Sequence, residues 1–236
     1  MRNAAKLGMM GMLLLAAASA PFYAAEEPAA SIHLRIAPSK VQKTHPVPAV
    51  VWLLPEPGTP ASPFNLHGPY TLVQKNRTFV PHLQVIPVGA AVQFPNEDPY
   101  FHNVFSMYAG KRFDLGLYEA GATKSVTFPR EGVSYIFCNI HPEMSAVVVA
   151  LSTSLYGIAS AENAVSIHNI LPGDYTLHIW VEGVPESILQ DQTRRVHLSA
   201  HNVDLGTITL PIAAGSGIGH SNKFGKPYIP LPKQPY

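Results

Sequence analysis

The chain has 236 residues, of which 13% are charged, and its formal net charge at pH 7 is +1. A balance this close to neutral excludes the basic surface expected of a protein that binds nucleic acid or an anionic membrane. The chain has one cysteine, so it forms no internal disulfide, and in an oxidising compartment this thiol must be buried, paired between chains or bound to a metal.

The first 25 residues have the pattern of a secretory signal peptide. Arg2 and Lys6 precede an apolar run from Leu7 to about Ala20, which ends in small residues. The run is too short to span a bilayer comfortably, and no later apolar run is long enough to do so. We therefore expect a periplasmic or secreted protein, with no membrane span in the mature chain and a cleavage site that the sequence does not fix.

The rest of the chain predicts an all-β protein, because short alternating runs are separated by Pro and Gly and no helical period is convincing. Residues 31–36 and 47–54 read as strands, and the proline-rich residues 55–63 read as a stiff linker. Eight more strands are expected near residues 71–75, 83–87, 90–95, 102–107, 113–117, 123–128, 133–138 and 146–151.

The last two of these strands are joined by a loop with the spacing Cys138-x-x-His141-x-x-Met144. Thiolate and thioether sulfur are soft donors and imidazole is intermediate, so this set favours copper over magnesium, calcium or manganese. Two His and one Cys in a trigonal set with a weak axial Met make a blue-copper electron-transfer site. The second histidine is expected to be His102, which opens an alternating apolar run after a turn-rich segment.

With these ligands in view, residues 71–151 resemble the cupredoxin family, and the short ligand loop is most similar to that of amicyanin. Four further segments carry the resemblance: Phe79–Pro81, Val88–Asn96, the pair His102–Asn103, and Phe128–Gly132. The resemblance implies a Greek-key β-sandwich over residues 70–151. It also implies a single copper ion, cycling between Cu⁺ and Cu²⁺, with His102, Cys138, His141 and Met144 as ligands.

The resemblance also implies roles for residues around the ligands. Asn103 stands where the family has an asparagine that ties the two ligand loops together by hydrogen bonds. Ile140 stands where amicyanin has proline, so it keeps an N–H that can donate to the Cys138 sulfur and raise the reduction potential. Glu143 stands where amicyanin has an aromatic residue, and its charge makes the surface near the site less apolar.

Residues 164–180 contain a strand, a Pro-Gly-Asp turn and a second strand, and they resemble the carboxypeptidase regulatory-like, transthyretin-like sandwiches. We expect residues 31–60 and 152–211 to form a second small β-sandwich, into which the cupredoxin unit is inserted. The alternative is one extended cupredoxin over residues 31–151 with a C-terminal appendage. Residues 212–236 are rich in Pro and Gly and are expected to form a tail that is loose or wraps the surface.

The function expected from this site is one-electron transfer between periplasmic redox partners, with no enzymatic activity. His141 would be the electron port, and Phe101, Met107, Pro142 and Glu143 are candidates for the rim that a transient partner touches. No partner can be identified from the sequence, and none is expected to be a nucleic acid.

Two alternatives remain open at this stage. A periplasmic copper carrier would bind the ion without shuttling electrons, although the scarcity of methionine argues against a storage role. An oxidase or reductase would need further histidines and an open metal position, which four ligands would fill.

Overall fold

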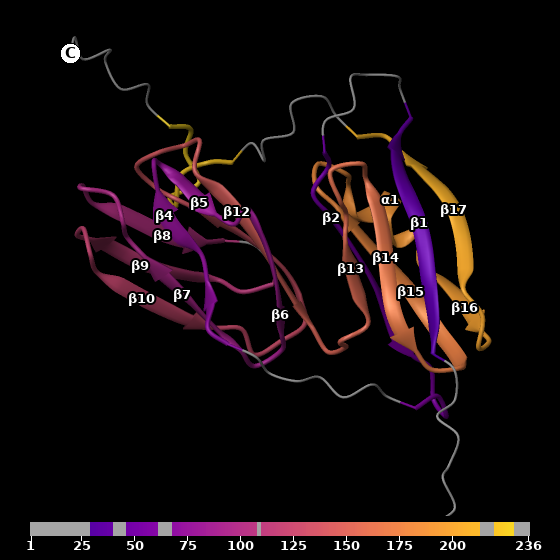
Figure 1. Cartoon of the computed structure of the whole chain (residues 1–236). Coiled ribbons are helices and arrows are strands. Elements are labelled where there is room, and N and C mark those ends of the chain that lie inside the picture. The colour runs from indigo at the N-terminus through magenta and orange to yellow at the C-terminus, as the bar shows by residue number, and fades with distance from the viewer. Residues whose placement is uncertain (1–28, 40–45, 61–67, 108–109, 213–219, 229–236) are drawn as a thin grey trace, which may run out of the picture.

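The computed structural model describes residues 29–39, 46–60, 68–107, 110–212 and 220–228. They form four stacked β-sheets, one β-hairpin and one short helix, so the prediction of an all-β protein is confirmed (Figure 1). The expected signal peptide lies outside the described residues. Among the residues described, no helix is long and apolar enough to cross a membrane.

The first half of the molecule is a β-sandwich formed by residues 70–151. Its five-stranded sheet has the order β6 (Leu83–Pro87), β12 (Ser145–Leu151), β11 (Gly132–Phe137), β8 (His102–Ser106) and β9 (Phe113–Tyr118). The facing sheet has the order β10 (Thr123–Thr127), β7 (Ala91–Pro95) and β3 (Tyr70–Thr71), and a hairpin joins β4 (Val73–Lys75) to β5 (Thr78–Val80).

The second half is built from strands that are distant in the sequence. One sheet has the order β14 (Ala164–Ile170), β1 (Ala30–Pro38) and β17 (Val203–Leu210), and the other has the order β13 (Tyr156–Ile158), β2 (Ala49–Pro55), β15 (Gly173–Val181) and β16 (Arg194–Leu198). The helix α1 (Glu186–Gln190) follows β15. The division of the chain into two domains stays a prediction, and the pairing of β1 and β2 with strands after residue 155 supports it.

Strand β12 is buried on both of its faces. Ala146, Val148 and Ala150 point into the core of the first sandwich. Val147 and Val149, which alternate with them, pack in the core that contains the second half. Side chains alternate across a strand, so a strand covered on both sides needs apolar residues at every position. The uninterrupted run from Ala146 to Leu151 meets this need and holds the two halves together.

The tail crosses to the first sandwich. Residues 220–228, drawn in yellow, lie against its upper end in the view of Figure 1. The other residues of the tail, 213–219 and 229–236, are outside the described part of the chain. Of the two expectations for the tail, residues 220–228 match the one in which it wraps the surface.

Candidate metal centre

Three neighbouring strands bring the predicted ligands together. Cys138 directly follows β11, and Met144 directly precedes β12, which pairs with β11 so that Phe137 lies opposite Ser145. His102 is the first residue of β8, which pairs with β11 on its other side. Residues at the matching ends of adjacent strands share one edge of a sheet, so the Cys138–Met144 loop and the start of β8 meet there.

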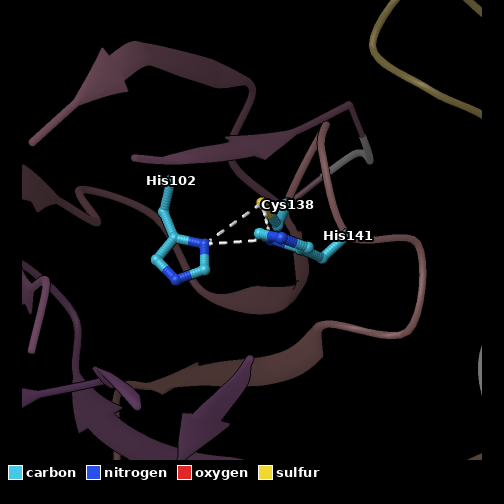
Figure 2. Close-up of side chains that lie close together, drawn as sticks. All are labelled: His102, Cys138 and His141. Carbon is cyan, nitrogen blue, oxygen red and sulfur yellow. Dashed lines mark hydrogen bonds between the residues drawn. The ribbon is translucent and has the colours of Figure 1, made fainter. Parts of the chain in front are cut away.

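The side chains of His102, Cys138 and His141 converge on one point (Figure 2). The Cys138 Sγ lies 3.7 Å from Nδ1 of His102 and 3.8 Å from Nδ1 of His141. The two Nδ1 atoms lie 3.2 Å apart. A point equidistant from three atoms with these separations is about 2.1 Å from each, close to the bond lengths that imidazole nitrogen and cysteine sulfur make to a first-row metal ion.

Most of the donor set is shielded from water. His102, Cys138 and Met144 are fully buried, and His141 is only partly buried. The Met144 side chain packs in the same apolar core as Cys138. The ring of Tyr100 covers both imidazoles, with its centroid 5.3 Å from that of His102 and 5.8 Å from that of His141. The site therefore reaches the surface through His141.

The surroundings of Cys138 favour its thiolate form. Burial raises the pKa of the thiol, but the hydrogen bond with His102 and the backbone N–H groups of Asn103, Ile140 and His141 outweigh burial and bring the pKa below its usual value. The thiolate is the form that binds metal. The N–H of Ile140, which a proline at this position would lack, is one of the groups that lower this pKa.

The two histidines have different environments. Burial and the nearby His102 both lower the pKa of His141, which keeps its ring neutral and able to donate a lone pair at neutral pH. Burial also lowers the pKa of His102, but the hydrogen bonds with Cys138 and Asp98 outweigh it, and the pKa is raised. A metal ion bound at this place would have to displace the proton from His102.

Asp98 orients the His102 ring and was not foreseen from the sequence. Its Oδ2 accepts a hydrogen bond from Nε2 of His102 at 2.8 Å, so Nδ1 is left to face the other two donors. The backbone N–H groups of Asn76 and Arg77 donate to the same carboxylate at 2.7 and 3.0 Å. Burial raises the pKa of Asp98, but these bonds outweigh burial and keep the group charged. A carboxylate behind a metal-bound imidazole is a recurrent arrangement in metal sites.

Asn103 differs from the expectation in how it links the ligand loops. Its side chain does not reach the Cys138 loop, because Nδ2 donates to Oδ1 of Asp114 on β9 at 2.7 Å. Its backbone N–H instead helps to lower the pKa of the Cys138 thiol. The link between the two ligand segments therefore includes the main chain of Asn103, since β8 lies directly beside β11.

The expected rim residues do not all lie in one place. Phe101 is 56% exposed beside His102, and Pro142 and Glu143 are exposed directly after His141. Met107, in contrast, follows the last residue of β8 and so lies about 16 Å along that strand from His102, at 3.3 Å per residue. It lines a small cavity with Phe105, Phe137 and His220, on the flank of the site.

No family model matches this chain, and no curated protein matches it. Among solved structures, it is similar to a purple cupredoxin from Nitrosopumilus maritimus, with 24% identity over 35% of this chain and 100% of that one and a TM-score of 0.32. Amicyanin from Paracoccus versutus gives 21% identity, 35% and 80% coverage and a TM-score of 0.32.

A copper-containing nitrite reductase from Thermus scotoductus is similar at 24% identity and a TM-score of 0.34, over 42% of this chain and only 28% of that enzyme. TM-scores this low do not establish a function for the site, which has to be inferred from its own residues. The resemblance of residues 164–180 to the transthyretin-like sandwiches stays a prediction, since no family model matches the chain.

Proposed function

We propose that this protein transfers single electrons through one copper ion held by His102, Cys138, His141 and Met144. The observation that carries the proposal is the triangle formed by one sulfur and two Nδ1 atoms, with sides of 3.2 to 3.8 Å. A trigonal set of two imidazoles and a thiolate with a thioether nearby is the donor set of blue-copper sites, and it fits no hard cation.

The chain's own residues account for the properties that electron transfer needs. A copper ion bound here would supply one-electron chemistry by alternating between Cu⁺ and Cu²⁺. The β-sheet edge and the Asp98 hydrogen bond hold the donor atoms in place, so that little rearrangement accompanies a change of charge. The core around Cys138 and Met144 excludes water, and the partly exposed His141 offers a short route to a partner at the surface.

The same residues favour a carrier of electrons over an enzyme. A copper enzyme needs an open position for its substrate. Three donors already surround the point where the ion would lie, and Met144, which packs in the same core as Cys138, would supply the fourth. With the signal pattern at residues 1–25, we further propose that the protein works in the periplasm or outside the cell, with a redox protein as its partner.

Addition of Cu²⁺ to the purified protein tests the proposal. An intense visible absorption band from charge transfer between thiolate and copper is expected, and ascorbate should abolish it reversibly. The band should be lost in Cys138→Ala and retained in His33→Ala, which removes a histidine of β1 outside the cluster. A colourless protein that binds Cu⁺ and releases it readily to a chelator would contradict electron transfer and support a copper carrier instead.

A further inference from the structure

Residues 220–228, called the C-terminal strap below, hydrogen-bond to the Cys138–Met144 loop at three points. The Tyr228 hydroxyl donates to the carbonyl oxygen of Cys138 at 2.9 Å. Nε2 of His220 lies 2.9 Å from the carbonyl oxygen of Pro142 and donates to it. The backbone N–H of Lys223 donates to Oδ1 of Asn139 at 3.0 Å. The strap thus contacts the ligand Cys138 and the residues that directly follow the ligands Cys138 and His141.

Ring packing fixes the strap against the strand that leads into the loop. The His220 ring stacks on Phe137, the residue before Cys138, with centroids 3.8 Å apart and planes inclined by 23°. The Tyr228 ring meets the His220 ring edge to face at 5.2 Å. Since Phe137 is fully buried at the end of β11, the stack joins the strap to the rigid part of the sheet.

The strap also reaches the segment that carries the other ligand. Lys223 Nζ forms an ion pair with Oδ2 of Asp114 at 2.7 Å, and Oδ1 of the same carboxylate accepts from Asn103, which follows His102. A single carboxylate on β9 therefore connects the strap to the start of β8. Within the strap, His220, Lys223 and Tyr228 make contacts on both sides of the site.

Within itself, the loop is closed by two backbone hydrogen bonds, from Cys138 N to Met144 O at 3.3 Å and from Met144 N to His141 O at 3.0 Å. The strap satisfies the carbonyl groups of Cys138 and Pro142, which face outward from this turn. We propose that His220, Lys223 and Tyr228 are positioning residues that hold the ligand loop closed. The effect of these residues on copper release rests on the proposed function, whereas their effect on the metal-free loop does not.

The metal-free protein provides the first test, because Cys138 is its only cysteine and is fully buried. The rate at which an aromatic disulfide modifies the thiol then measures opening of the loop. Tyr228→Phe should raise this rate at least about threefold, because it removes the hydrogen bond to Cys138 and the contact of the hydroxyl with Nδ1 of His220. The combined variant H220A/K223A/Y228F should raise it more than tenfold. Tyr156→Phe, which changes a tyrosine of β13 in the second half, should leave it unchanged.

A conservative variant separates the stacking of His220 on Phe137 from its hydrogen bond to Pro142. His220→Phe keeps a ring to stack on Phe137 but cannot donate to Pro142, so its rate should fall between those of the wild type and His220→Ala. The rate of copper loss to a chelator should rise in the same order. Circular dichroism at each step checks that the fold is retained.

Equal thiol-modification rates in the wild type and the combined variant would overturn the positioning role. This outcome is distinct from failure of the proposed function, in which the wild type binds no copper with charge-transfer absorption while thiol reactivity still reports on the strap. If thiol reactivity rises but copper loss does not, the part of the proposal that concerns copper is wrong.

Discussion

Asp98 determines which nitrogen of His102 faces the thiol. The carboxylate is buried and holds the Nε2 side of the ring, so Nδ1 points to Cys138 and His141. Its negative charge also lies one imidazole ring away from the place of the ion. A charge so close should stabilise the more positive oxidation state of copper.

The variant Asp98→Asn keeps the size of the side chain and removes the charge. Copper affinity should fall by about tenfold or more, as for other partners of metal-bound histidine. The reduction potential should rise, because Cu²⁺ loses more stabilisation than Cu⁺. Competition with a chelator and a redox titration measure the two effects, and Asp204→Asn on β17 serves as a control. An unchanged or lower potential in Asp98→Asn would count against this role.

A second prediction concerns the N–H of Ile140, which helps to lower the pKa of the Cys138 thiol. A hydrogen bond to the sulfur stabilises the reduced site, so Ile140→Pro should lower the reduction potential. A difference of about 1 kcal/mol between the two oxidation states corresponds to about 40 mV for one electron. Ile140→Val keeps the N–H and should match the wild type in a redox titration. A potential in the proline variant above that of the wild type would contradict the prediction.

The ligands themselves were the easiest residues to predict. Cys138, His141 and Met144 lie within one short loop, so their spacing alone indicates that their side chains can meet. Their donor atoms indicate the class of metal ion that they would bind. Asp98 was missed, although it stands four residues before His102 in the same turn-rich segment. A carboxylate at that distance from a predicted ligand was the available signal. The contacts of His220 and Tyr228 span 78 and 90 residues, and no pattern in the sequence points to them.

At the scale of a single element, β12 has no solvent-facing side. Val148 belongs to the core of the first sandwich and Val149 to the core that contains the second half, and both are fully buried. The strand was predicted, but its second covered face was not. The sequence did indicate a strand covered on both faces, because Ala146–Leu151 lacks the polar residues that a strand with one solvent-exposed face has at alternate positions.

Adjacent substitutions in β12 should therefore cost similar amounts of stability. Val148→Ala and Val149→Ala should each lower the free energy of unfolding by about 2 kcal/mol, since each leaves a cavity in a packed core. Leu117→Ala, at a side chain of β9 that is 60% exposed, should change it by less than about 0.5 kcal/mol. Urea unfolding of the metal-free protein measures all three. A near-zero effect of Val149→Ala would show that the outer face of β12 is not a core.

At the scale of the whole molecule, a polar contact joins the two halves. His82 precedes β6 of the first sandwich, and its Nε2 lies 2.8 Å from Oε1 of Glu182, which follows β15 of the second half. Its Nδ1 lies 3.1 Å from the carbonyl oxygen of Ser145. Both partners are acceptors, so the doubly protonated ring satisfies both. The hydrogen bond to Glu182 raises the pKa of His82 more than burial lowers it.

This contact should make the stability of the molecule depend on pH. A raised pKa means that the contribution is full below about pH 6.5, the value for the unfolded chain, and is lost as the pH rises through the folded-state pKa. The His82 side chain is 39% exposed, so the contribution should stay below about 1 kcal/mol. The difference in unfolding free energy between wild type and His82→Gln should thus shrink from pH 5.5 to pH 8.5.

The variant Glu182→Gln provides the control for that measurement. In the Glu182→Gln background, the effect of His82→Gln on the free energy of unfolding should lose most of its pH dependence, because the carboxylate that raises the pKa of His82 is absent. The metal-free protein is used throughout, so that titration at the metal site cancels between the paired variants. If the effect of His82→Gln on the free energy of unfolding still depends on pH in the Glu182→Gln background, the pH dependence arises from a group other than this pair.

The arrangement of the whole chain was partly predictable. The all-β class and the position of the first sandwich follow from alternation and from turn residues, because strands lie at all eight expected ranges. Residues 71–75 divide into β3 and β4, however, and β5 was not expected. The partners of β1 and β2 were suggested only because the first sandwich has its full number of strands without them and residues 152–211 are too few to form a sandwich alone. The parallel pairing of β1 with β17 and the stacking of the sheets depend on contacts between distant residues, which one sequence does not reveal.

The central claim about function is that one sulfur and two imidazole nitrogens bind the same copper ion. X-ray absorption at the copper edge of the loaded protein tests it directly. The account predicts two nitrogen neighbours at about 2.0 Å and one sulfur at about 2.3 Å or less, with the short sulfur neighbour lost in Cys138→Ser. A copper environment of nitrogen and oxygen alone in the wild type, unchanged in Cys138→Ser, would contradict it.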